Sequence, residues 1–284
     1  MLSIKQINQE IVKPVRFKEE EEDKRPVRGR DLFPEIYGNI FFCARKKSGK
    51  TCSIYHIIDR CSTKETSVIA FVSTLNRDPT WKAIQNLCKK RGIDFTGFTS
   101  LRDEETKEDI LGSIVKTLEK QADEEKSEGS QATQPRRALY MEGDDNDDDT
   151  KTKRPKEKAP KIIFVLDDLS GELKNPSVTE LLKKNRHFKC KVLLSSQYWN
   201  DISLSGRKQI DYALLFRGLL QSMDKLEEIY KNIDLAVPFE TFVAIYRICT
   251  AEKFNFMWID VVNSEFRKNF SHRIQVRERS DRQA

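Results

Sequence analysis

Short apolar runs alternate along this chain with segments whose apolar residues recur at helical spacing. Strands are predicted for residues 40–43, 67–72, 94–98, 161–166, 191–197, 212–216 and 256–262. Helices are predicted for the segment that starts near residue 50 and for residues 81–88, 107–120, 177–184, 223–232 and 239–250. Uninterrupted apolar runs are typical of strands buried on both faces, as in a parallel sheet covered by helices. The pattern therefore predicts an α/β fold, a three-layer sandwich with a mostly parallel sheet.

The first predicted strand leads into a polar turn and then a helix, within residues 39–60. The turn ends in Gly49, Lys50 and Thr51, which match the end of the phosphate-loop (P-loop) motif GxxxxGK[ST]. Strand, loop and helix form the context that this motif requires. Ala44 stands where the motif has its first glycine, and we expect it to be tolerated if that position needs close approach but not a positive φ. The alternative interpretation is a basic turn between a strand and a helix.

The residue types of this loop suit a nucleotide phosphate. Gly49 can adopt backbone angles that let amide groups converge on an anion, and the start of the helix adds unpaired N–H groups. Lys50 would reach the β- and γ-phosphates, and the Thr51 hydroxyl would ligate Mg²⁺. The predicted nucleotide-binding residues are Ala44, Arg45, Lys46, Lys47, Ser48, Gly49, Lys50, Thr51 and Cys52.

Two later strands end in polar side chains that would complete such a site. The apolar run 161–166 leads directly into Asp167 and Asp168, which is the pattern of a Walker B strand. Asp167 would hold Mg²⁺ through a water, and Asp168 would orient and deprotonate the attacking water. Gln197, at the end of the next strand, would sense the γ-phosphate or hold that water by hydrogen bonds. The alternatives are an aspartate that caps a turn and an ordinary polar residue at a strand end.

The composition adds charged segments to this fold. The 284 residues include 51 Lys and Arg against 45 Asp and Glu, a net charge of +6 that is compatible with a nucleic-acid partner. Residues 1–33 and 271–284 are predicted to be a charged arm and a basic tail that flank a P-loop domain over 34–270. Residues 121–160 have an acidic half, a basic half and little apolar surface, so they are predicted to form a disordered insertion.

Cysteine usage and hydropathy narrow the class of protein further. The six cysteines form no CxxC pair and no Cys/His cluster, which argues against a zinc site. The sequence contains no long apolar run, and residues 1–30 are highly charged. We therefore expect a soluble intracellular protein without a membrane partner.

Four stretches, in this order, resemble a single family. They are the P-loop, the loop STLNRDPTW after the second strand, the sequence VLDDL, and NRHFKCKVLLSSQYWNDI with Arg207 downstream. Together they are similar to the DNA-packaging ATPases of the FtsK–HerA superfamily, in the poxvirus-type branch of large DNA viruses, virophages and Maverick/Polinton elements. The similarity covers roughly residues 36–270, except for 121–160. We interpret Trp81, which ends STLNRDPTW, as a helix anchor in the core.

The resemblance implies ATP and Mg²⁺ as cofactors, and it gives Lys50 and Thr51 the roles stated above. It also implies an arginine that acts across a subunit interface, where its planar donors would stabilise charge on the neighbour's γ-phosphate. Arg186, in the pair Arg–His before the strand 191–197, matches that arginine, and Arg207 is the other candidate. The alternative for either residue is an ordinary surface or ion-pair arginine.

The resemblance further implies ATP hydrolysis that drives double-stranded DNA through a homo-oligomeric ring into a capsid. The expected partners are double-stranded DNA and capsid proteins. The expected location is inside the host, in the nucleus or a cytoplasmic virus factory, or on the virion. One rival is a P-loop helicase or recombination ATPase without a capsid role. A second rival is a nucleotide- or DNA-binding scaffold that does not hydrolyse ATP, for which Ala44 is the only support.

Overall fold

A nine-stranded sheet forms the centre of the described part of the chain, which comprises residues 25–131, 157–169, 171–219 and 223–276 of a computed structural model. The sheet order is β3-β2-β4-β5-β1-β6-β7-β8-β9. The strands are β1 Asn39–Cys43, β2 Ser67–Val72, β3 Asp94–Phe98, β4 Ile162–Asp167, β5 Cys190–Ser196, β6 Tyr212–Phe216, β7 Phe256–Asp260, β8 Glu265–Lys268 and β9 His272–Ile274. Strands β1 to β6 pair in parallel, and β7 to β9 continue the sheet in antiparallel pairs.

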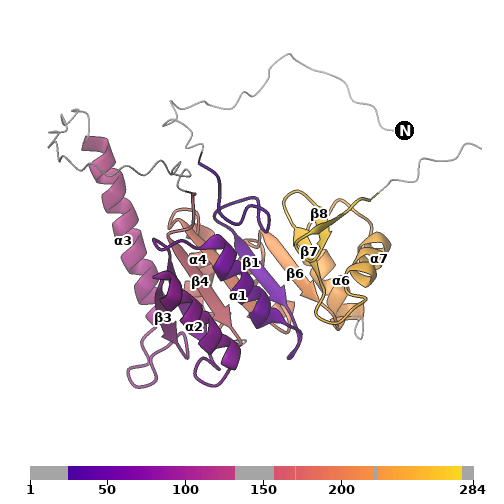
Figure 1. The fold of residues 1–284 in the computed structure, drawn as a ribbon, viewed down its shortest axis with the longest axis horizontal. Helices are drawn as coiled ribbons and strands as arrows, with labels where there is room; N and C mark the ends of the chain where they lie inside the picture. Colours follow the sequence, from indigo (N-terminus) through magenta and orange to yellow (C-terminus); the bar gives the residue numbers. More distant parts are fainter. Residues whose placement is uncertain (1–24, 132–156, 170, 220–222, 277–284) are drawn as a thin grey trace, which may run out of the picture.

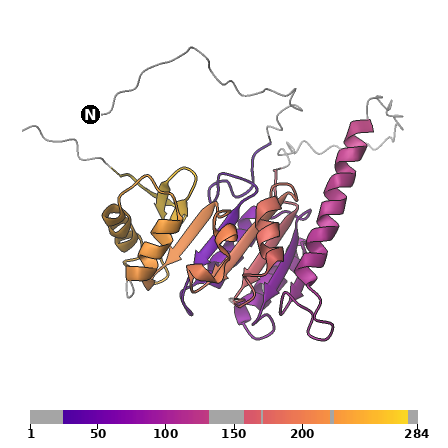
Figure 2. The same ribbon diagram turned by 180° about the vertical axis from the view of Figure 1, so that it is seen from behind.

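Helices cover both faces of this sheet (Figures 1 and 2). They are α1 Lys50–Cys61, α2 Pro79–Arg91, α3 Ile110–Gln131, α4 Pro176–Lys184, the 3₁₀ helix η1 Trp199–Asp201, α5 Leu204–Arg207, α6 Met223–Asn232 and α7 Phe239–Cys249. Apolar residues of α1 and α2 pack on one face, and those of α3, α4, η1, α6 and α7 pack on the other. The predicted fold class, a three-layer α/β sandwich with a mostly parallel sheet, is confirmed.

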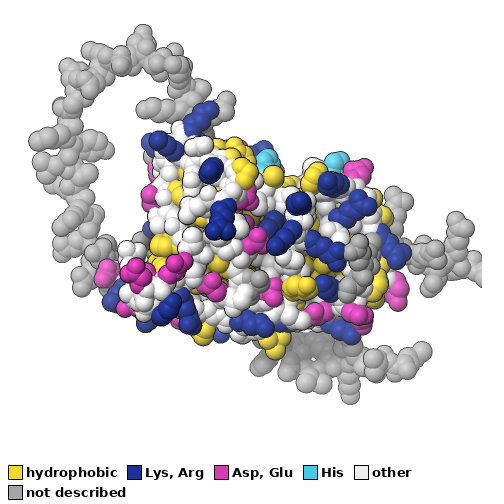
Figure 3. Space-filling model, turned by 90° about the horizontal axis from the view of Figure 1, so that it is seen from below, with side chains coloured by type: hydrophobic (Ala, Val, Ile, Leu, Met, Phe, Trp, Pro, Cys, Tyr) yellow, Lys and Arg dark blue, Asp and Glu magenta, His cyan; other side chains and the backbone are white. Residues whose placement is uncertain are grey.

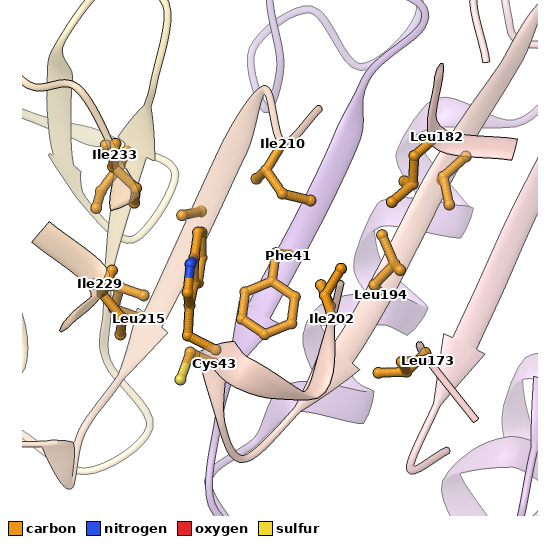
Figure 4. Packing of buried hydrophobic residues seen from close by; sticks show 14 of the residues in the cluster. Phe41, Cys43, Leu173, Leu182, Leu194, Ile202, Ile210, Leu215, Ile229 and Ile233 are labelled. Atoms are coloured by element: carbon orange, nitrogen blue, oxygen red, sulfur yellow. The ribbon is translucent and has the colours of Figure 1, made fainter. Parts of the chain in front are cut away.

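Side chains of β1 alternate between the two layers, as the period of a strand requires. Phe41 and Cys43 belong to the core under η1 and α4, whereas Ile40 and Phe42 belong to the core under α1. The ring of Phe41 meets that of Trp199 edge-on, with centroids 4.9 Å apart. Figure 4 shows Phe41 between side chains from neighbouring strands and loops. Because every β1 side chain is buried, an apolar run rather than an alternating pattern marks this strand.

Capping residues set the helix boundaries where periodicity alone did not. Asp78 precedes α2, and its carboxylate accepts a hydrogen bond of 2.8 Å from the backbone N–H of Thr80. Pro79 occupies the first turn, where its missing N–H costs nothing, and Gly92 ends the helix with a left-handed φ of 65°. The helix predicted over 81–88 therefore extends to Pro79–Arg91.

The described residues shift three predicted segment boundaries. Leu32 and Phe33 are buried in the core, so the fold begins before the predicted start at 34. Helix α3 continues to Gln131, into the predicted insertion 121–160, because residues 118–131 are rich in good helix formers. Strand β9 lies within the predicted basic tail 271–284 and pairs with β8. Residues 1–24, 132–156 and 277–284 of the three predicted segments lie outside the described residues.

Candidate nucleotide-binding site

The loop between β1 and α1 contains two residues with positive φ just before the helix. Gly49 precedes α1 with φ 96° and ψ 8°, and no side chain caps the start of the helix. Lys47 also takes a positive φ, 61°, whereas Ala44 does not. Ala44 is buried, and its N–H donates to the Ser196 carbonyl at 3.0 Å, which extends the β1–β5 pairing by one residue. Alanine therefore fits this position without strain, as the sequence led us to expect.

Lys50 opens α1 and points to the ends of β4 and β5. Its Nζ lies 2.9 Å from Asp167 Oδ1 and also forms an ion pair with Asp168. The same ammonium donates to Ser195 Oγ at 3.2 Å. Lys50 is only 8% exposed, so these partners compensate a charge that has left water. The structure thus brings together three of the predicted site residues, Lys50, Asp167 and Asp168, from α1 and β4.

Asp167 is fixed by more partners than the sequence suggested. Trp81 Nε1 donates to its Oδ2 at 3.2 Å, and the Ser195 hydroxyl donates to its Oδ1. Trp81 is fully buried, as expected of a core anchor, and it also orients a site carboxylate. Sequence reasoning missed Ser195, although its place in the polar end of an apolar strand was a usable signal.

Asp168 differs from Asp167 in backbone and exposure. It follows β4 with φ 57°, a left-handed conformation that aspartate tolerates better than most residues. Its side chain is 30% exposed, against 2% for Asp167. One carboxylate is therefore locked in the sheet, and the other faces the opening of the site, where water and substrate have access.

Among the remaining loop residues, Ser48 leaves a buried hydroxyl open to a ligand. Ser48 Oγ is buried and has no hydrogen-bond partner among the described residues. Thr51 is half-buried and Cys52 exposed, both in the first turn of α1. Arg45, Lys46 and Lys47 are exposed. Figure 3, which views the edge where the parallel strands end, shows Lys and Arg side chains across the middle of this face.

Gln197 lies next to the loop, not among the buried charges. It lines a hollow of about 390 Å³ together with Arg45, Lys46, Tyr198 and Lys225. Its carbonyl accepts a weak contact of 3.7 Å from the Cys43 thiol. Within the described ranges, no hydrogen bond joins its side chain to Lys50, Asp167 or Asp168. The predicted role at the γ-phosphate therefore stays a prediction.

The two candidate arginines lie away from Lys50. Arg186 pairs with Glu35 at 3.0 Å and with Asp211 at 3.4 Å, and its side chain is 61% exposed. Asp211 also accepts from the N–H of Asn39, the first residue of β1, which places Arg186 at the opposite end of the strands from the phosphate loop. Arg207 ends α5 and donates to the Ile202 carbonyl at 2.9 Å. Within the part of the chain that the structure describes, neither arginine forms a hydrogen bond or ion pair with Lys50, Asp167 or Asp168.

Comparison with known proteins connects this geometry to a described fold. No family model and no curated protein matches the sequence. The genome-packaging NTPase B204 of Sulfolobus turreted icosahedral virus 2, solved with AMP, superimposes with a TM-score of 0.51 at 15% identity, over 86% of this chain and 100% of B204. This chain has the fold of B204. The resemblance to packaging ATPases is thereby confirmed at the level of the fold.

Two further structures match less closely than this form of B204. The DNA-packaging ATPase B204 of Sulfolobus turreted icosahedral virus gives a TM-score of 0.47 at 17% identity, over 81% of this chain and 95% of the other. The cytoplasmic domain of the type VII secretion ATPase EccC from Thermomonospora curvata gives 0.41 at 13% identity, over 78% of this chain and 24% of that one.

On the B204-like fold, the site residues have the donor set that a magnesium–nucleotide complex requires. Mg²⁺ prefers one or two carboxylates, waters and substrate phosphates to a cage of protein ligands. The Thr51 hydroxyl would supply one oxygen ligand, and the Asp167 carboxylate would hold the ion through a water. Among the described residues, no group of three or more His, Cys, Asp or Glu forms a separate metal cluster. No described helix is long and apolar enough to cross a membrane.

Proposed function

We propose that this chain hydrolyses ATP and couples hydrolysis to the translocation of double-stranded DNA into a capsid. The observation that carries the proposal is the convergence of Lys50, Asp167, Asp168 and Ser195 beside a loop with open donors. Catalysis of phosphoryl transfer requires positioned positive charge, a metal-holding carboxylate and a residue that handles water. Packaging is supported by the resemblance and by the B204-like fold.

Each residue has one task in this proposal. Lys50 exchanges its carboxylate partners for the β- and γ-phosphates when ATP binds. Thr51 would hold Mg²⁺ directly and Asp167 through a water, and the ion would neutralise charge that develops on the phosphates. Asp168, the more exposed carboxylate, orients and deprotonates the attacking water. Gln197 holds that water or senses the γ-phosphate from the rim.

The proposal includes a homo-oligomeric ring that acts on DNA inside the host cell or at the virion. In such a ring, Arg186 or Arg207 reaches the γ-phosphate of the neighbouring subunit. Arg186→Ala is then expected to lower turnover and to be rescued in mixed rings by subunits with an intact Arg186. If Arg207→Ala shows this rescue and Arg186→Ala does not, the arginine that acts in trans is Arg207.

The test is ATPase activity with and without double-stranded DNA, measured beside the native mass of the assembly. Lys50→Ala and Asp168→Asn are expected to lose turnover, and Asp168→Asn is expected to bind ATP still. Lys64→Ala, an exposed lysine at the other end of the strands, is the matched control. A monomer without DNA stimulation would overturn the translocase, and normal turnover by Asp168→Asn would overturn its role with water.

A further inference from the structure

The loop between α7 and β7 places an exposed aromatic ring against the phosphate loop. A Cβ built on Gly49 would lie 3.3 Å from Phe254 Cδ1 and 3.7 Å from Phe254 Cβ. Phe254 therefore contacts the glycine that starts α1. The residue is nevertheless 56% exposed, so more than half of its surface is open to solvent.

The backbone of this loop is strained and is held in place from outside. Phe254 has φ 70°, an unfavourable value for a bulky residue. Asn255 donates to Glu252 at 2.8 Å and accepts from Asn269 at 2.9 Å, and Asn269 accepts in turn from the N–H of Phe256 at 3.1 Å. Strained residues persist where neighbouring structure fixes them, and they cluster at ligand clamps. The network thus holds Phe254 in its place beside Gly49.

Positive charge accompanies the ring. Lys253 Nζ lies 4.9 Å from the centroid of Phe254, within the range of a cation–π contact. The first turn of α1 and the P-loop lysines add further positive charge close by. A ligand that combines a flat aromatic group with phosphates matches an exposed ring beside an anion-binding loop. A nucleotide has this combination.

We propose that Phe254 is the platform on which the base of the bound nucleotide stacks, an inference that rests on the proposed function. The P-loop and Lys50 hold the phosphates, and Phe254 binds the base by the π-face opposite the Lys253 ammonium. Stacking accepts any base, because every base has a π-face. The site is therefore expected to bind ATP and GTP with similar affinity.

The experiment is calorimetric titration of the full chain with Mg²⁺ and ADP, with Mg²⁺ and a non-hydrolysable ATP analogue, and with inorganic tripolyphosphate. Phe254→Asn removes the ring and keeps a residue that tolerates positive φ, whereas Phe254→Tyr keeps the ring. We expect Phe254→Asn to weaken nucleotide binding roughly tenfold, with tripolyphosphate binding unchanged. Phe254→Tyr should bind like the wild type. Ile248→Ala, which changes a side chain 59% exposed on α7, is the matched control.

The outcomes separate this inference from the proposed function. Equal weakening of nucleotide and tripolyphosphate by Phe254→Asn, or no weakening, overturns base stacking. Lys50→Ala tests the site itself and must weaken binding of both ligands. If the wild type binds neither ligand, or if Lys50→Ala binds both normally, the proposed function fails, and the stacking inference fails with it.

Discussion

Asp167 illustrates how single residues set the chemistry of the site. Its Oδ2 accepts a hydrogen bond from Trp81, and its Oδ1 accepts one from Ser195 and forms an ion pair with Lys50. A buried carboxylate held in this way cannot rotate toward solvent, and its orientation is fixed before a ligand arrives. Such preorganisation would avoid the cost of ordering the group on binding of the proposed Mg²⁺.

We predict that Trp81→Phe weakens magnesium-dependent ATP binding without leaving a large cavity in the core. The substitution keeps most of the ring but leaves Asp167 Oδ2 without the indole donor, a loss of about 1–3 kcal/mol in the free energy of unfolding. Magnesium-dependent binding of ATP should weaken several-fold. Urea unfolding and a Mg²⁺ titration of ATP binding measure the two effects.

Trp199→Phe is the matched control for this prediction. Trp199 is also buried, but its Nε1 has no partner among the described residues. Its replacement should change packing against Phe41 and leave the magnesium dependence unaltered. Equal effects of the two substitutions on magnesium dependence would show that the Trp81–Asp167 bond has no special role.

The start of α1 shows what one element contributes to the site. The helix begins at a glycine with positive φ, and the Phe254 ring lies over that glycine. The backbone angle therefore favours glycine at position 49, and a Cβ there would also require the Phe254 ring to shift slightly. A second glycine with positive φ, Gly92, ends α2 and has nothing within 4 Å of a built Cβ.

Substitution of these two glycines distinguishes the cost of backbone strain from the cost of steric contact. Gly92→Ala should cost about 1 kcal/mol in the free energy of unfolding, because alanine disfavours a positive φ. Gly49→Ala should cost more, since its Cβ also presses on Phe254, and it should weaken nucleotide binding. Thermal unfolding and calorimetry measure the differences. An equal loss in the free energy of unfolding for the two substitutions would mean that the Phe254 ring moves aside without an energetic cost.

The periodicity of apolar residues predicted the helices and strands better than it predicted the contacts between them. The strands Ser67–Val72 and Tyr212–Phe216 and the helix Met223–Asn232 lie where the pattern placed them. The hydrogen bond from Trp81 to Asp167 joins residues that are 86 positions apart, and no local pattern reports it. Strands β8 and β9 were missed, because their charged side chains hide a pairing that the sheet edge provides.

Across the whole molecule, the segment before β1 closes one core. Phe33 is 1% exposed, and its ring meets those of Tyr212, Trp258 and Phe270 at centroid distances of 5.0, 6.3 and 5.8 Å. It therefore connects residues near the amino terminus with the antiparallel strands at the other end of the chain. The sequence assigned Phe33 to a solvated arm because the charged residues before it outnumber the apolar ones.

We predict that Phe33→Ala destabilises the protein by roughly 3–5 kcal/mol, the usual cost of emptying a core position of a phenyl ring. Val262→Ala, at a side chain that is 70% exposed, should change the free energy of unfolding by less than about 0.5 kcal/mol. Denaturant unfolding measures both. A small effect of Phe33→Ala would mean that this residue belongs to the solvated arm and not to the core.

The buried thiols predict how stability depends on pH. Burial raises the pKa of Cys190 from 9.0 to about 12, and that of Cys43 likewise to about 12. Unfolded thiols ionise above pH 9 while folded ones stay protonated, so the stabilisation present below pH 9 is lost as the pH rises toward 12. Each thiol contributes a fall of about 1.4 kcal/mol per pH unit in this window. Burial lowers the pKa of Lys191, which acts in the opposite direction.

Comparison of variants isolates the thiol contribution, because that of Lys191 is common to all of them. Cys190→Ala should make the decline in the free energy of unfolding above pH 9 less steep. Val262→Ala, which changes an exposed side chain that does not ionise, should leave the slope as it is. Identical slopes for wild type and Cys190→Ala would contradict the raised pKa.

Helix α3 determines where the segment 132–156 is attached. The helix starts after the loop that follows β3 and ends at Gln131, beyond the edge of the sheet where the parallel strands begin (Figure 1). On return, the Lys158 N–H donates to the Pro26 carbonyl at 2.8 Å, and Lys161 bonds to the residue before β5. Both attachment points are thus remote from Lys50. An affinity tag or fluorophore inserted there would serve as a handle for immobilising the protein with its phosphate loop facing the solution.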